Sequence, residues 1–140
     1  MNSRPESVPG ATSADGLAGQ VDYRLTRNAL LRQFRRGRLS KLDVCDAHPE
    51  LLRAARALGR PTAEDCPICQ SAPVVHVSYA FGRRLSPGGH AFADAAELAK
   101  LARRAGEVAC YVVEVCPSCS WHHLVRTFAV GPRRRATGRR

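Results

Sequence analysis

Residues 107–119, EVACYVVEVCPSC, run from an apolar stretch directly into a Cys-Pro-x-Cys motif, and residues 66–69, CPIC, form a second motif of the same kind. Two residues between the cysteines let one tight turn present both sulfur atoms to a single metal ion. Two such turns predict a closed tetrahedral site with four thiolate ligands, which is typical of structural zinc. The predicted ligands of this one Zn²⁺ ion are Cys66, Cys69, Cys116 and Cys119.

The strands beside the motifs explain how cysteines so far apart in the chain can meet. Forty-six residues separate Cys69 from Cys116, many more than in the simplest four-cysteine pattern. Residues 74–81, VVHVSYAF, and residues 107–115 both have strand-like patterns and nearly equal lengths. If they pair antiparallel, the two motifs lie at the same end of a sheet, and the segment between them is an insertion at the far end. This is a zinc-ribbon arrangement with an enlarged hairpin.

Hydrophobic periodicity predicts the other elements. Residues 22–36, 47–58 and 95–105 have the apolar spacing of helices. Residues 121–130 are predicted to be a further strand, with Leu124 and Phe128 on one face. We therefore expect an α+β fold, in which a small antiparallel zinc-ribbon-type sheet of about three strands carries an inserted helix and is preceded by two N-terminal helices.

Composition divides the chain into three parts. Residues 1–20 are rich in Ser, Gly, Pro and Ala and have almost no large apolar side chains, so they are predicted to be a disordered leader. Residues 132–140 carry five arginines and no acidic residue, which predicts a disordered basic tail. The residues between, 21–131, are expected to form a single domain with its first helices in 22–60 and a zinc-ribbon-like part in 64–131.

The positive charge is concentrated in two segments. The chain of 140 residues has a formal net charge of +10, and residues 22–43 and the tail 132–140 each contribute +5. A GC-rich genome also favours arginine, so the position of the arginines is more informative than their number. Basic segments beside a nearly neutral middle favour a polyanionic partner, whose phosphates they would contact. The candidate phosphate-binding residues are Arg24, Arg32, Arg35, Arg36, Arg133, Arg134 and Arg135.

Several residues near the motifs have an open role. Cys45 is expected to be a small buried apolar residue, and Cys110 a core residue of its strand. Trp121 either packs over the metal site or offers a stacking platform for an unpaired base. Whether Cys45, His48, His122 or His123 assists the metal site stays open at this point.

Other classes of protein have no support in the sequence. No apolar run approaches the length of a membrane span, and the first residues lack the apolar stretch of a signal peptide, so we expect a cytoplasmic protein. In that reducing compartment, six cysteines are metal ligands or free thiols rather than disulfides. There is no P-loop, dinucleotide-binding glycine pattern or HExxH motif, so we expect neither an enzyme nor a small-molecule substrate.

The segments CDAHPELLRAA (45–55) and CSWHHLV (119–125), together with the two Cys-Pro-x-Cys motifs, carry a resemblance. Over about residues 21–131 the chain resembles a family of small actinobacterial proteins that is grouped only as a domain of unknown function. The resemblance implies a shared fold and a high-GC bacterial cytosol, and no mechanism. The motifs are also similar to those of zinc ribbons in transcription and translation proteins, where Gly commonly follows the second cysteine; here Gln70 and Ser120 stand in that place.

Three functions are consistent with these features. The first is a structural-zinc nucleic-acid or ribonucleoprotein binding module, in which arginines contact phosphates. The second is an adaptor that binds proteins of the RNA polymerase or the ribosome through its two N-terminal helices. The third is a redox-responsive zinc switch, in which oxidation of the thiols releases the metal.

Overall fold

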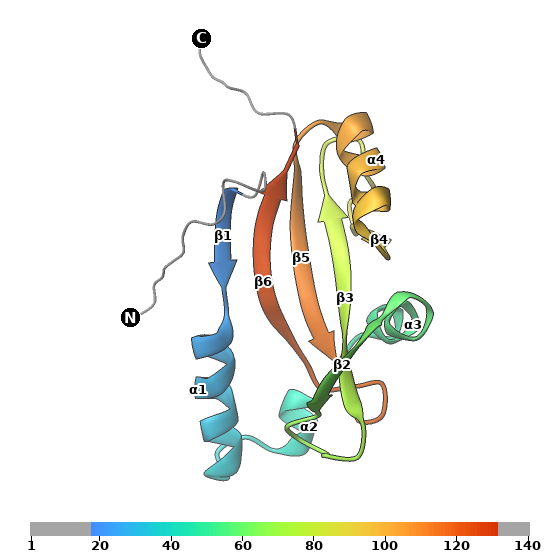
Figure 1. The fold of residues 1–140 in the computed structure, drawn as a ribbon. Coiled ribbons are helices and arrows are strands. Elements are labelled where there is room, and N and C mark those ends of the chain that lie inside the picture. The colour runs from blue at the N-terminus through green and yellow to red at the C-terminus, as the bar shows by residue number, and fades with distance from the viewer. Residues whose placement is uncertain (1–17, 132–140) are drawn as a thin grey trace.

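A six-stranded antiparallel sheet forms the centre of the protein, and four helices pack around it (Figure 1). The computed structural model describes residues 18–131. The strands lie in the order β1-β6-β5-β3-β2, and β4 pairs with β3 off this path. In chain order the elements are β1 (Ala18–Asp22), α1 (Arg24–Arg35), α2 (Lys41–Val44), α3 (Pro49–Leu58), β2 (Arg60–Asp65), β3 (Pro73–Phe81), β4 (His90–Phe92), α4 (Ala95–Ala105), β5 (Val108–Val115) and β6 (His122–Val130).

The expected fold class is wrong in the size of the sheet and in the order of its first elements. The sheet has six strands where about three were expected, because β1, β2 and β4 were not predicted. The strand β1 precedes the first helix, and the short helix α2 lies between the two N-terminal helices that were expected. Both β1 and β2 are edge strands whose described side chains are mostly exposed, so their sequences lack the apolar alternation that marks a strand with one buried face.

The ends of the chain lie outside the described residues. This holds for residues 1–17 of the predicted leader and for the whole predicted tail 132–140. Residues 18–20 of the predicted leader belong to β1, whose pairing with β6 joins Ala18 to Ala129 and Asp22 to Arg126. Backbone pairing with a neighbouring strand orders this segment, which has too few apolar side chains to do so by its own burial.

The predicted pairing of the two strands beside the cysteine motifs is present. The strands β3 and β5 pair antiparallel in an unbroken register from Val75 opposite Val115 to Phe81 opposite Ala109. The first motif leads into β3 and the second follows β5, so both lie at the same end of the sheet. The helix α4 lies at the opposite end (Figure 1).

Helices cover both faces of the sheet. On one face, Leu101 of α4 packs in a cluster with Ala80 and Cys110. Alternation along β3 places Val77 on the opposite face, where it packs with Val115 and with Ala55 of α3. The third cluster, described below, lies at the motif end and includes the cysteines. Within residues 18–131, no helix is both long enough and apolar enough to cross a membrane.

Candidate metal centre

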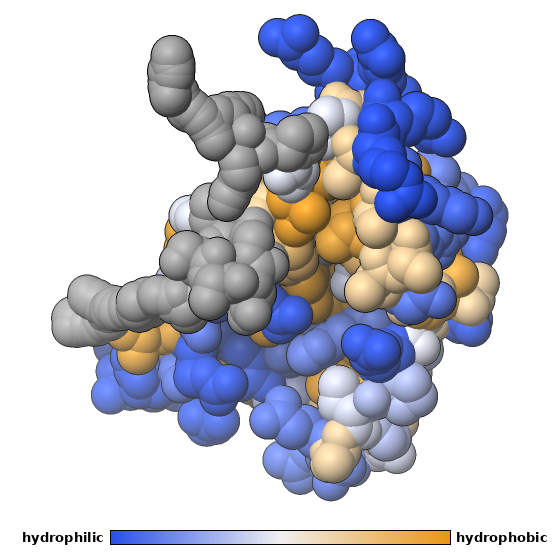
Figure 2. Space-filling model, turned by 45° about the horizontal axis from the view of Figure 1, so that its top comes forward, coloured by the Kyte–Doolittle hydropathy of each residue, from blue (hydrophilic) through white to orange (hydrophobic). Residues whose placement is uncertain are grey.

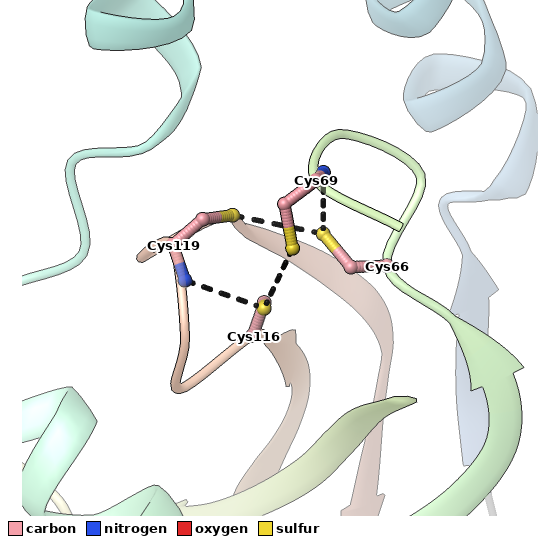
Figure 3. A group of neighbouring side chains, drawn as sticks. All are labelled: Cys66, Cys69, Cys116 and Cys119. Carbon is pink, nitrogen blue, oxygen red and sulfur yellow. Dashed lines mark hydrogen bonds between the residues drawn. The ribbon is translucent and has the colours of Figure 1, made fainter. Parts of the chain in front are cut away.

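The four predicted ligands lie together at one end of the sheet (Figure 3). Their sulfur atoms are all within 4.8 Å of one another. The distances between the two motifs are 3.7 Å for Cys66 Sγ to Cys119 Sγ and 3.7 Å for Cys69 Sγ to Cys116 Sγ. A tetrahedron with metal–sulfur bonds of about 2.3 Å has edges of about 3.8 Å, so the cluster has the dimensions of a site that could hold one metal ion.

The two motifs form the same turn. In the first, the Gln70 amide donates to the Cys66 carbonyl at 3.0 Å, and in the second the Ser120 amide donates to the Cys116 carbonyl at 2.9 Å. Gln70 has φ 56° and Ser120 has φ 77°, which is the left-handed region that glycine adopts without strain. The turn therefore explains why glycine is common at this position in the zinc ribbons that the motifs resemble.

Backbone amides point at the sulfur atoms. The amides of Ile68 and Cys69 donate to Cys66 Sγ at 3.4 and 3.5 Å. Those of Ser71 and Cys119 donate to Cys69 Sγ and Cys116 Sγ, each at 3.4 Å. Such hydrogen bonds stabilise thiolates, the form in which cysteine binds metals.

Burial and hydrogen bonding act in opposite directions on these thiols. Burial acts to raise the pKa of Cys69, but hydrogen bonds from the Ser71 amide and neighbouring side chains lower it to about 6. Burial raises the pKa of Cys66 and of Cys116. Burial also raises the pKa of Cys119, to about 12. Binding of a cation at this cluster therefore displaces protons from the buried thiols.

The cluster is enclosed by apolar side chains. Cys66 and Cys116 are fully buried and pack with Leu31 of α1, Val44 of α2 and Trp121. Trp121 has 0% exposed surface, which confirms that it is a core residue. No face of its ring is open to an unpaired base.

A buried ion pair lies beside the cluster, and sequence reasoning missed it. Glu114 is 3% exposed, and its carboxylate accepts hydrogen bonds from Arg27 Nε at 2.9 Å and Arg27 Nη2 at 3.0 Å. It also accepts one from Trp121 Nε1 at 2.6 Å. These contacts join α1 to β5 and to the residue that follows the second turn. Two features of the sequence could have indicated this pair. Arg27 lies on the apolar side of the predicted helix 22–36, and Glu114 lies within a run of valines.

Of the four residues whose role was open, one contacts the cluster. The Cys45 thiol donates to Cys119 Sγ at 3.5 Å and is half-buried, so Cys45 is more than the buried apolar residue that was expected. His48 accepts a hydrogen bond from the Glu50 amide and caps α3. His122 pairs with Asp46 at 3.0 Å, and the His123 ring stacks on Trp121 with centroids 5.9 Å apart. Among the described residues, the compact group of possible metal ligands contains no histidine.

The sixth cysteine lies away from the cluster. Cys110 is fully buried in the apolar cluster beneath α4, as was predicted. Burial raises the pKa of its thiol to about 11.

The predicted phosphate-binding arginines of the first helix are exposed. None of them belongs to the four-cysteine cluster. Within residues 18–131 the ion pairs involve Arg27, Arg53 and His122, and none of the arginines predicted to bind phosphate. The surface on the side of α1 is mainly hydrophilic (Figure 2). The exposed residues of the prediction are Arg24, Arg32, Arg35 and Arg36, whereas Arg133, Arg134 and Arg135 lie outside the described residues.

Comparison with known proteins gives relatives of unknown function. The chain is 44% identical over 116 residues to the uncharacterized protein Rv0049 of Mycobacterium tuberculosis and to the uncharacterized protein Mb0050 of Mycobacterium bovis. Each match covers 83% of this chain and 85% of the relative. No solved structure matches the chain. Residues 17–140 match the model of the family of unknown function DUF5318, and the chain belongs to that family.

Proposed function

We propose that the four-cysteine cluster holds one Zn²⁺ ion with a structural role. The observation that carries this proposal is the pair of 3.7 Å sulfur–sulfur distances between the two turns. Four thiolates in a tetrahedron favour zinc or iron, and they leave no open position at which a substrate could bind. The proposed module is therefore a scaffold and not an enzyme.

Metal analysis tests the identity of the ion. The protein purified without added metal is expected to contain one zinc per chain, measured by atomic emission spectroscopy. Cys69→Ser and Cys116→Ser are expected to lose the metal, and Cys110→Ser, which removes a thiol outside the cluster, is expected to keep it. Iron at the same stoichiometry, or metal retained in the two ligand variants, would overturn the proposal.

We further propose that α1 and the residue after it bind nucleic acid, free or within a ribonucleoprotein, through phosphates. Arg24, Arg32 and Arg35 lie within about 80° of one another around the helix, at about 100° per residue. They extend along about 17 Å of its length, at about 1.5 Å per residue. With Arg36 they form a row of guanidinium groups that have no acidic partner among the described residues. Such a row matches a phosphate backbone and carries no sequence preference.

A charge reversal with a matched control tests this surface. We expect the full chain to bind fluorescent RNA and DNA oligonucleotides at about 50 mM salt, with affinity that falls steeply as salt is added. The double variant Arg32→Glu, Arg35→Glu is expected to weaken binding and to reduce the slope of log K against log salt by about 2. The control Arg103→Glu, Arg104→Glu changes the net charge equally on the exposed side of α4. Equal losses in both variants, or no binding at low salt, would contradict the proposal.

A protein-adaptor function is the second candidate, and exposed leucines favour it. Leu25 of α1 is 64% exposed and Leu42 of α2 is 86% exposed. Large apolar side chains in such positions are suited to contact with another protein. The adaptor function predicts that RNA polymerase or ribosomal proteins co-purify after nuclease treatment and that Leu25→Ser with Leu42→Ser abolishes this. Co-purification that nuclease removes would instead favour the nucleic-acid function.

A further inference from the structure

A fifth thiol touches the metal cluster without belonging to it. Cys45 Sγ lies 3.5 Å from Cys119 Sγ, which is closer than the 3.7 Å contacts between sulfurs of the cluster itself. Among the described residues, the group whose sulfurs all lie within 4.8 Å of one another contains Cys66, Cys69, Cys116 and Cys119 and not Cys45. A tetrahedral site filled by those four has no place for another ligand, so Cys45 remains a thiol when the metal is bound.

Accessibility separates Cys45 from the buried thiols. Cys45, Cys69 and Cys119 are half-buried, whereas Cys66 and Cys116 are fully buried, and of the three half-buried cysteines Cys69 and Cys119 are proposed metal ligands. Cys45 is therefore the thiol at the cluster that combines partial exposure with freedom from metal coordination. Exposure and freedom from a metal are two of the properties that favour reaction of a thiol with an oxidant from solvent.

We propose that Cys45 and Cys119 form an oxidative modification site, in which a disulfide between them removes one ligand from the metal. The inference rests on the proposed zinc centre and names the pair through which it would respond to peroxide. Cys45 gives its proton to solvent, its thiolate attacks one oxygen of hydrogen peroxide, and the O–O bond breaks; Cys45 sulfenic acid forms and the hydroxide that leaves takes up a proton as water. The Cys119 thiolate then attacks the Cys45 sulfur, the Cys45 S–O bond and the bond from Cys119 to the metal break, and a second hydroxide leaves and takes a proton from solvent. The two sulfurs lose two electrons in all, and one peroxide becomes two waters.

The structure allows the movement that this bond needs. The two sulfurs must approach from 3.5 Å to about 2.05 Å. Cys45 lies at the C-terminal end of α2, a helix of four residues. Val44 is the one buried residue of this helix, and Leu42 is 86% exposed, so a shift of α2 disturbs few contacts. The sulfurs of Cys66 and Cys119 are also close, but metal coordination holds both at the edge of a tetrahedron.

Treatment of the purified full-length protein with hydrogen peroxide tests the proposal. Zinc release is followed with a chromogenic chelator, and disulfides are mapped by mass spectrometry of non-reduced peptides. The wild type is expected to form the Cys45–Cys119 disulfide and to release zinc with it. Reductant with added zinc is expected to reverse both changes.

Two variants separate the role of Cys45 from a general loss of thiols. Cys45→Ser and Cys45→Ala are expected to bind zinc as the wild type does and to release it several-fold more slowly at the same peroxide dose. Cys110→Ala, which removes a thiol away from the cluster, is expected to behave as the wild type. Release from the Cys45 variants at the wild-type rate, or a map that joins Cys119 to Cys66, overturns the proposal.

The experiment distinguishes failure of the proposed modification site from failure of the proposed zinc centre. Protein that contains no zinc refutes the zinc centre, and the disulfide map of that metal-free protein still shows whether Cys45 pairs with Cys119. If Cys45→Ser fails to fold, Cys45→Ala and the wild-type map provide the result. A zinc-loaded protein in which peroxide forms no Cys45–Cys119 disulfide refutes the modification site alone.

Discussion

At the scale of single residues, the four-cysteine cluster depends on backbone conformations that its own sequence disfavours. Gln70 and Ser120 both have positive φ, although neither is glycine. Left-handed backbone costs a residue with a Cβ about 1–2 kcal/mol. In the first turn this conformation places the amide of the next residue, Ser71, where it donates to Cys69 Sγ at 3.4 Å.

Replacement of Ser120 by glycine is expected to stabilise the zinc-loaded protein. The relief of about 1–2 kcal/mol exceeds the extra entropy of a glycine in the unfolded chain, about 0.5–1 kcal/mol. Ser120→Val is expected to destabilise it, because a β-branched side chain fits this conformation poorly. Chemical denaturation measures both changes.

Ser118→Gly is the matched control, since Ser118 lies in the same turn without a positive φ. It is expected to be less stable than the wild type, because glycine raises the conformational entropy of the unfolded chain and no backbone strain is relieved in the fold. If Ser120→Gly is the less stable of the two glycine variants, the account of the turn is wrong.

One histidine gives a prediction about pH. Burial lowers the pKa of His76 below its ordinary value of 6.5; the charge of Glu114 acts to raise this pKa, and the charge of Arg126 lowers it further. His76 is thus held neutral in the fold, so its contribution to stability is present above pH 6.5 and is lost as the pH falls through its lower folded pKa. His76→Gln is expected to flatten this part of the stability curve between about pH 7 and 5. The free energy of unfolding of the wild type and of His76→Gln is measured over that pH range. The same pH dependence in both proteins would contradict the role given to His76.

At the scale of elements, a buried ion pair helps to hold the first helix against the sheet. Arg27 of α1 and Glu114 of β5 form two hydrogen bonds, and Trp121 donates a third to the same carboxylate. This pair borders a cleft of about 170 Å³ between α1 and the sheet. The arrangement of charges, in addition to apolar packing, therefore sets the position of the helix that carries the exposed arginines.

Removal of Arg27 alone is expected to lower the free energy of unfolding more than removal of both charges of the pair. Arg27→Met leaves the Glu114 carboxylate buried without its cation, which costs about 3–5 kcal/mol. The double variant Arg27→Met, Glu114→Gln removes both charges and keeps an acceptor for Trp121 Nε1, so it is expected to recover much of that loss. A double-mutant cycle of unfolding free energies measures the coupling, and strictly additive losses would contradict this role for the pair.

Hydrophobic periodicity in the sequence was sufficient to predict the helices and strands that have a buried face. It was insufficient to predict the other elements. It placed α1, α3 and α4, the pairing of β3 with β5, and the meeting of the two cysteine motifs. It missed β2 because all its side chains except Thr62 are exposed and Pro61 is unusual within a strand. It also placed Leu124 and Phe128 on one face, but an irregularity in β6 sets Leu124 opposite Val113 and Phe128 opposite Cys110. Such contacts across the sheet, like that of Cys45 with Cys119, depend on tertiary structure.

At the scale of the whole molecule, the proposed metal is expected to affect the two ends of the sheet differently. The apolar cluster at the motif end contains all four ligand cysteines together with Leu31 and Trp121. The cluster beneath α4 contains none of the four. A structural zinc ion contributes on the order of 10 kcal/mol to folding in small domains, so we expect the effect of the proposed ion on stability to be concentrated at the motif end.

Chelation of the metal is expected to expose the motif end first. Amides in residues 66–71 and 116–121 are expected to lose protection from hydrogen exchange, while those of α4 and β4 retain more. Cys119→Ser is expected to give the same pattern without chelator, and Cys110→Ser is expected not to. A uniform loss of protection over the described residues would show that the two ends of the sheet unfold together, which would contradict the prediction.

The convergence of four sulfurs on one ion underlies the whole account, and X-ray absorption at the zinc edge measures it most directly. The spectrum of the purified protein is expected to fit four sulfur neighbours at about 2.3 Å and no nitrogen or oxygen. A shell of mixed sulfur and nitrogen or oxygen, or a protein that binds no zinc, would contradict it.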